Sequence, residues 1–173
     1  CMKLGAADYI QKPFTPDELL AILNPILASK KPRVPEKLKL LVVEDNRVEM
    51  KQYENRLSGR IFEKAYARDG EMAVTMYREF KPDILMMDLM LPCKSGYNVL
   101  KEIRAEDAST AVIIVSSLDS KDDILACAKL GIEGYLLKPV NFSGLNVKIL
   151  DCYGKKSTEK AEIAAVFKQL LLE

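Results

Sequence analysis

Residues 83–88 read DILMMD, and the four consecutive apolar residues between the two aspartates indicate the fold class of this chain. A run that is apolar throughout, rather than at alternate positions, is typical of a β-strand covered on both faces inside a parallel sheet. Four further short runs predict strands, and segments with helical spacing of apolar residues follow each of the five. This strict alternation predicts an α/β fold with a doubly wound, five-stranded parallel sheet and helices on both faces. The predicted strands are 38–43, 61–67, 83–88, 111–115 and 134–139, and the predicted helical segments are 46–59, 71–80, 97–106, 121–131 and 141–156.

The composition of the 173 residues limits the classes of function. Apolar residues make up 49% and charged residues 29%, a balance typical of a folded domain. The net charge of +1 gives no support for direct binding to nucleic acid or to a membrane surface. No signal peptide, no apolar run of about 20 residues and no CxxC pair is present, so we expect a cytoplasmic protein with reduced thiols. The absence of histidine excludes histidine-based metal sites and Ser-His-Asp triads within this chain.

Polar residues stand where the predicted strands end. Glu44 and Asp45 follow the first strand, Asp88 ends the third, Ser116 follows the fourth, and Lys138 lies near the end of the fifth. Because the carboxyl ends of parallel strands share one edge, we expect these side chains to converge. Clustered carboxylates repel one another unless a cation shares the site, and a hard divalent ion such as Mg²⁺ prefers oxygen ligands. The plainer alternative is a set of unrelated, solvated polar residues.

Four motifs resemble the receiver domain of two-component response regulators: VVEDN (42–46), MMDLMLPCKSG (86–96), VSS (115–117) and GYLLKP (134–139). The resemblance covers residues 38–154 and implies a flavodoxin-like sheet with the strand order 2-1-3-4-5. It also implies a function in phosphorelay signalling rather than turnover of a separate substrate.

The resemblance also implies roles for particular residues. Asp88 matches the phospho-acceptor, which takes a phosphoryl group from a phosphohistidine on a histidine kinase or a histidine phosphotransfer protein. Glu44, Asp45, Asp88 and the backbone carbonyl of Met90 match the ligands of Mg²⁺, the one cofactor expected. Lys138 matches the lysine that pairs with the phosphoryl oxygens, and its bond to the following proline is expected to be cis.

Two further positions match the residues that transmit the structural change caused by phosphorylation. Ser116 matches the hydroxyl that is drawn in after phosphorylation, and Tyr135 matches the aromatic residue that moves with it. The face formed by residues 121–131, 134–139 and 141–153 is the expected partner or dimer interface. Because the apolar Met90 and Leu118 flank the expected water route, we also expect slow autodephosphorylation.

Three other functions share features with this sequence pattern. The first is a receiver-like scaffold or dimerisation module that is never phosphorylated. The second is a Mg²⁺-dependent phosphatase of the haloacid-dehalogenase kind, which requires a second acid two residues after the nucleophile, where Met90 stands. The third is a flavodoxin-like electron carrier, but NRVEM (46–50) replaces the phosphate-binding loop which that class requires.

The first residues of the chain repeat a later stretch. CMKLGAADYIQKPF (1–14) and CAKLGIEGYLLKPV (127–140) share seven of fourteen residues at a constant offset of 126. We therefore expect residues 1–28 to be the C-terminal fragment of a preceding receiver in a tandem pair, joined by a linker at 29–37, and expect this segment to favour a homodimer. Residues 155–173 are predicted to form a helical extension, either packed on the domain or leading toward another module.

Overall fold

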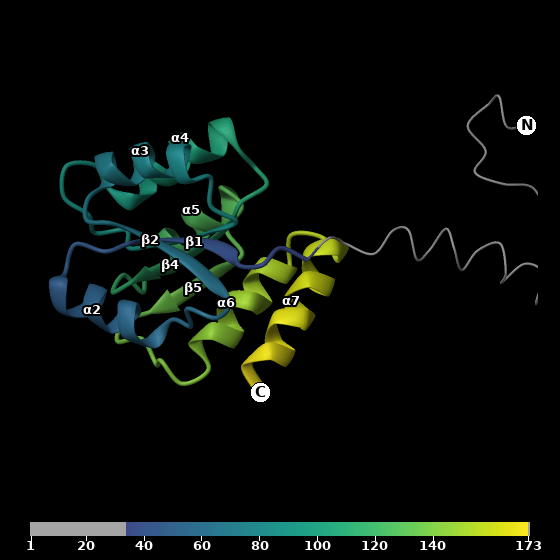
Figure 1. Cartoon of the computed structure of the whole chain (residues 1–173). Coiled ribbons are helices and arrows are strands. Elements are labelled where there is room, and N and C mark those ends of the chain that lie inside the picture. The colour runs from purple at the N-terminus through teal and green to yellow at the C-terminus, as the bar shows by residue number, and fades with distance from the viewer. Residues whose placement is uncertain (1–33, 173) are drawn as a thin grey trace, which may run out of the picture. The chain divides into compact units, whose positions relative to one another are not determined.

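The computed structural model describes residues 34–172, which form a three-layer α/β domain (Figure 1). Its centre is a five-stranded sheet in the order β2-β1-β3-β4-β5, with every neighbouring pair parallel. This confirms the predicted doubly wound sheet and the strand order implied by the resemblance. The strands are β1 (Leu38–Val43), β2 (Phe62–Ala67), β3 (Ile84–Met87), β4 (Ala111–Ser116) and β5 (Gly134–Leu137).

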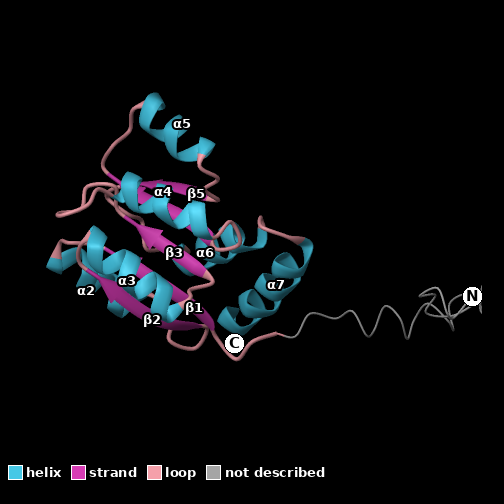
Figure 2. Cartoon of the chain, turned by 90° about the horizontal axis from the view of Figure 1, so that it is seen from above, coloured by secondary structure: helices cyan, strands magenta, loops and turns pink. Residues whose placement is uncertain are grey.

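Helices cover both faces of the sheet, as Figures 1 and 2 show from two directions. One face packs against α2 and α6, and the other against α3, α4 and α5. A further helix, α7, lies beside α6. The helices are α2 (Arg47–Arg56), α3 (Gly70–Phe80), α4 (Gly96–Glu106), α5 (Lys121–Lys129), α6 (Leu145–Gly154) and α7 (Thr158–Leu172).

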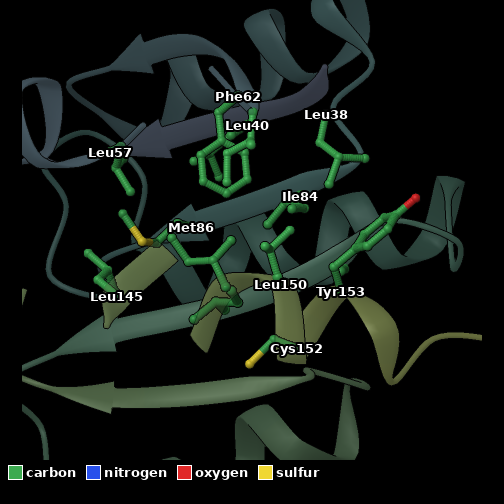
Figure 3. Packing of buried hydrophobic residues seen from close by; sticks show 14 of the residues in the cluster. Leu38, Leu40, Leu57, Phe62, Ile84, Met86, Leu145, Leu150, Cys152 and Tyr153 are labelled. Atoms are coloured by element: carbon green, nitrogen blue, oxygen red, sulfur yellow. The ribbon is translucent and has the colours of Figure 1, made fainter. Parts of the chain in front are cut away.

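The apolar strands supply both cores because successive side chains point to opposite faces of the sheet. On β3, Ile84 and Met86 join the core under α2 and α6, while Leu85 and Met87 join the core under α3, α4 and α5. All four side chains are at most 1% exposed, as the uninterrupted apolar run predicted. Figure 3 shows the first of these cores, in which Ile84 and Met86 pack among side chains of β1, β2 and α6.

Two glycines determine where helices end and begin in the C-terminal part of the domain. Helix α5 ends at Lys129, two residues earlier than predicted, and Gly131 has a φ of +80° that a helix cannot contain. Gly144 has a φ of +72° and caps α6, which starts one residue later at Leu145. The glycine therefore weakens no helical turn, because it stands just outside the helix.

The predicted C-terminal helix packs on the domain. Ile163, Ala164 and Phe167 of α7 are buried in the same core as Tyr153 of α6. Lys160 extends to the carbonyl of Ser109 with a hydrogen bond of 2.6 Å, which ties the first turns of α7 to the loop before β4. This segment is therefore a helix packed on the domain.

The predicted receiver fragment at 1–28 and the first part of the predicted linker lie outside the described residues. Within residues 34–172, none of the helices is both long enough and apolar enough to cross a membrane.

Candidate functional site

Strand register brings the predicted site residues to one edge of the sheet. Val43 is paired with Met87, so the residues that follow them, Glu44 and Asp88, lie side by side, and the Asp88 N–H donates to the Val43 carbonyl at 3.1 Å. On the other side of β4, the Lys138 N–H donates to the carbonyl of Ser116, the last residue of that strand, at 3.0 Å. The convergence expected from the sequence is therefore present.

Asp88 occupies the centre of this edge and is only 5% exposed. Its Oδ1 accepts hydrogen bonds from the Ser116 hydroxyl at 3.0 Å and from the Met90 backbone N–H at 2.9 Å. Its Oδ2 accepts a hydrogen bond from Lys138 Nζ at 2.6 Å. Both oxygens of the carboxylate are thus oriented by residues from different parts of the chain.

The Lys138 ammonium contacts three carboxylates at once. It lies 2.6 Å from Asp88 Oδ2, 2.7 Å from Glu44 Oε2 and 2.7 Å from Glu49 Oε2. Burial by itself would lower the pKa of Lys138, but hydrogen bonds to Asp88, Glu44 and Glu49 outweigh burial and raise that pKa. Lys138 is therefore a fixed positive charge inside an otherwise acidic site, and the expected cis bond to Pro139 is present.

Three carboxylates form the candidate metal site. One oxygen each from Glu44, Asp45 and Asp88 lies within 4.8 Å of the other two. Glu44 is buried and Asp45 is exposed, so the cluster opens to solvent on the side of Asp45. Burial raises the pKa of Glu44, an effect that its hydrogen bond to Lys138 reduces in part. A group of carboxylate oxygens with a solvent-facing side fits a hard divalent cation that keeps some of its water.

The two predicted switch residues lie on the adjacent strands β4 and β5 but make different contacts, and Tyr135 pairs with Ile114 rather than with Ser116. The Ser116 hydroxyl, fully buried, already contacts the unmodified Asp88 carboxylate, whereas the resemblance implied an approach after phosphorylation. Tyr135, half-buried on β5, donates its hydroxyl hydrogen to the Leu118 carbonyl at 2.8 Å. The loop after β4 therefore contacts both residues, since the Leu118 N–H also faces the Ser116 hydroxyl at 3.5 Å.

Two residues of this site were missed from the sequence. Glu49 reaches Lys138 from the first turn of α2; an acid three residues after the capping Asn46 was the available signal. Gly96 starts α4 against the backbone of Asp88, where a Cβ atom would lie 2.1 Å from the Asp88 carbonyl oxygen. The glycine permits this close approach of α4 to the strand end.

The fold and the site together define a receiver-like α/β domain, and comparison with known proteins agrees. The family model described as "Response regulator receiver domain" matches residues 40–150. The chain is 33% identical over 113 residues to the probable transcriptional regulator ycf27 of Guillardia theta, covering 65% of this chain and 44% of that protein. It is 29% identical over 128 residues to the DNA-binding response regulator MtrA of Mycobacterium tuberculosis, covering 74% of this chain and 56% of that protein.

A solved structure shows the same likeness. The CheX–CheY–BeF₃–Mg²⁺ complex from Borrelia burgdorferi matches with a TM-score of 0.61 and 26% identity, covering 68% of this chain and 87% of that one. The present chain belongs to the response regulator receiver family, whose members are signalling domains of two-component systems rather than turnover enzymes. It spans about half the length of the two curated relatives named above.

Proposed function

We propose that this domain is a phospho-accepting receiver in which Asp88 takes a phosphoryl group from a phosphohistidine of a histidine kinase or phosphotransfer protein. The observation that carries the proposal is the Asp88 carboxylate, held on one oxygen by Lys138 and on the other by Ser116, beside two further carboxylates. A scaffold that only binds partners does not require these carboxylates and Lys138 to be clustered at one edge of the sheet.

The proposed reaction needs positioning and charge neutralisation more than acid–base chemistry. An Asp88 oxygen attacks phosphorus, the P–N bond of the donor breaks, and its electron pair remains on the imidazole. Lys138 neutralises charge on the transferred group, and Ser116 supplies a hydrogen bond to it. The product is an aspartyl phosphate on Asp88.

The metal that fits this site is Mg²⁺, held by Glu44, Asp45, Asp88 and the backbone carbonyl of Met90. Bound there, it would supply positive charge that offsets the negative charge of the transferred phosphoryl group. Two findings support this assignment: the three clustered carboxylates and the similarity to a CheY solved with BeF₃ and Mg²⁺.

Phosphorylation is proposed to act on the face formed by α5, β5 and α6 through Ser116 and Tyr135. The support is that Ser116 contacts Asp88, while Tyr135, on β5, contacts the loop that follows Ser116. A new group on Asp88 must change the hydrogen bond that Ser116 makes, and the same loop transmits the change to Tyr135. Tyr135→Ala should leave phosphorylation intact and abolish the difference in partner binding between the two forms; an undiminished difference would contradict this route.

The proposed function is tested by incubating the protein with acetyl phosphate and Mg²⁺ and measuring intact mass. Wild type should gain one phosphoryl group, Asp88→Asn should gain none, and Asp122→Asn, which alters an exposed acid of α5, should behave as wild type. Omission of Mg²⁺ should also prevent the gain. An unmodified wild-type protein would instead favour the unphosphorylated scaffold.

A further inference from the structure

Glu49 differs from the other two carboxylates that contact Lys138. Glu44 and Asp88 also belong to the acidic cluster at the sheet edge, whereas Glu49 is not part of that cluster. A cation in the cluster would compete with Lys138 for the oxygens of Glu44 and Asp88 but would leave Glu49 to the lysine. Among residues 34–172, Glu49 is therefore the one carboxylate partner that Lys138 does not share with the candidate metal site.

Hydrogen bonds at the start of α2 fix the backbone position of Glu49. Asn46 caps α2, and its side-chain oxygen accepts hydrogen bonds from the N–H groups of Val48 at 2.9 Å and Glu49 at 3.3 Å. Glu49 thus stands in the first helical turn, with its side chain 32% exposed and directed to Lys138, whose own side chain is 14% exposed. An acid in this turn also favours the helix itself, which is the simpler explanation that a test must separate.

The contact between Lys138 and Glu49 affects how the ammonium group is oriented. An ammonium group has three N–H donors, and three carboxylates surround this one. Two of the donors form hydrogen bonds with Glu44 and Asp88, while the ion pair with Glu49 at 2.7 Å restrains the ammonium from the α2 side. Without Glu49 the ammonium loses the contact on the α2 side and can rotate or shift toward solvent.

We propose that Glu49 is a positioning residue that holds the Lys138 ammonium beside Asp88 from outside the acidic cluster. The proposal rests on the proposed function, because its consequence is faster phosphorylation of Asp88. Positioning and simple charge predict opposite effects. Removal of a negative charge alone would ease the approach of an anionic phosphodonor and speed the reaction, whereas loss of the anchor slows it.

The experiment compares three variants in the reaction with acetyl phosphate and Mg²⁺. Glu49→Met keeps side-chain length and helix propensity but has no oxygen, and Glu49→Gln keeps a neutral oxygen acceptor. Glu54→Met is the matched control, since Glu54 lies on the same helix and pairs with Lys51 instead. Glu49→Met should react about fivefold more slowly than wild type, a modest effect because the contact is partly exposed, and Glu49→Gln should lie between the two.

A second readout is independent of phosphorylation. In ¹H–¹⁵N spectra of the unmodified protein, the Lys138 ammonium signal, assigned by its loss in Lys138→Gln, should be visible in wild type and in Glu54→Met but broadened in Glu49→Met. A Glu49→Met protein that reacts as fast as wild type, or an equal loss of rate in the Met and Gln variants, would overturn the positioning role. An unreactive wild type would refute the proposed function instead, while the ammonium signal would still decide whether Glu49 anchors Lys138.

Discussion

The hydroxyl of Ser116 donates a hydrogen bond of 3.0 Å to Oδ1 of Asp88, although 28 positions separate the two residues in the chain. The parallel pairing of β3 with β4 brings them together. Lys138, which follows β5, contacts Oδ2 of the same carboxylate at 2.6 Å. The two adjacent strands β4 and β5 therefore fix the orientation of Asp88, and the site depends on the backbone geometry at the strand ends.

Gly96→Ala should disturb the backbone geometry at the end of β3, where Asp88 lies. The added Cβ would lie 2.1 Å from the Asp88 carbonyl oxygen and 2.8 Å from the Leu89 Cα, and neither backbone atom can move without shifting the strand end. We expect a loss of roughly 1–3 kcal/mol in the free energy of unfolding, together with slower phosphorylation. Chemical denaturation measures the first effect. Gly59→Ala, where nothing lies within 4 Å of the added atom, should change stability by less than about 0.5 kcal/mol; equal effects of the two substitutions would contradict this account.

Asp45→Asn should weaken Mg²⁺ binding by about tenfold or more, because one of three clustered carboxylates loses its charge. Calorimetric titration of Mg²⁺ into the unphosphorylated protein measures the effect directly. Since Asp45 is exposed, the substitution should leave the unfolding transition without Mg²⁺ almost unchanged. A variant that binds Mg²⁺ as tightly as wild type would place the metal elsewhere.

The sheet and most of the site could be predicted because both follow from local patterns. Buried parallel strands are apolar throughout, so β3 was identified from its composition, and parallel strands end at one edge, so Asp88, Ser116 and Lys138 were expected to converge. Strand order is not a local property: alternation of strands and helices is compatible with several orders, and only the resemblance implied the observed one.

Contacts that depend on how a helix lies over the sheet could not be predicted in the same way. Glu49 was indistinguishable from any acid in a first helical turn until the position of α2 above the sheet edge was known. Gly96 became informative only when α4 was seen against the backbone of Asp88. Likewise, the apolar positions of α7 predicted a buried face but did not indicate that Phe167 would pack in the core beneath α6.

Asp107 lies at the edge of the sheet opposite to the site. The substitution Asp107→Asn should reduce the stability of the domain at neutral pH. Burial by itself would raise the pKa of Asp107, but hydrogen bonds from Tyr77, Ser109 and Thr110 outweigh burial and hold that pKa well below its usual range. The ionised carboxylate therefore contributes stability that is fully present above the usual carboxyl pKa of about 3.9 and is lost as the pH falls through the lower folded-state pKa.

Urea denaturation at two pH values measures this contribution. The substitution should cost roughly 1–3 kcal/mol at pH ~7 and less at pH ~3. Glu63→Gln, which alters an exposed residue of β2, should cost little at either pH. A cost for Asp107→Asn that is the same at both values would show that the shape of the side chain matters rather than its charge.

The aspartyl phosphate on Asp88 should be long-lived. We expect its lifetime to be minutes or longer rather than seconds. Met90, two residues after the acceptor and 60% exposed, is apolar, and so is the half-buried Leu118 in the loop after β4. Neither side chain can orient an attacking water, so hydrolysis lacks the positioning from which phosphoryl transfer gains most of its rate. Met90→Asn supplies an amide at this position and should shorten the lifetime about fivefold, as followed by intact mass after removal of acetyl phosphate. Val166→Asn, on the exposed side of α7, should leave the decay unchanged. If wild type loses the phosphoryl group within seconds, water reaches phosphorus by a route that these two side chains do not control.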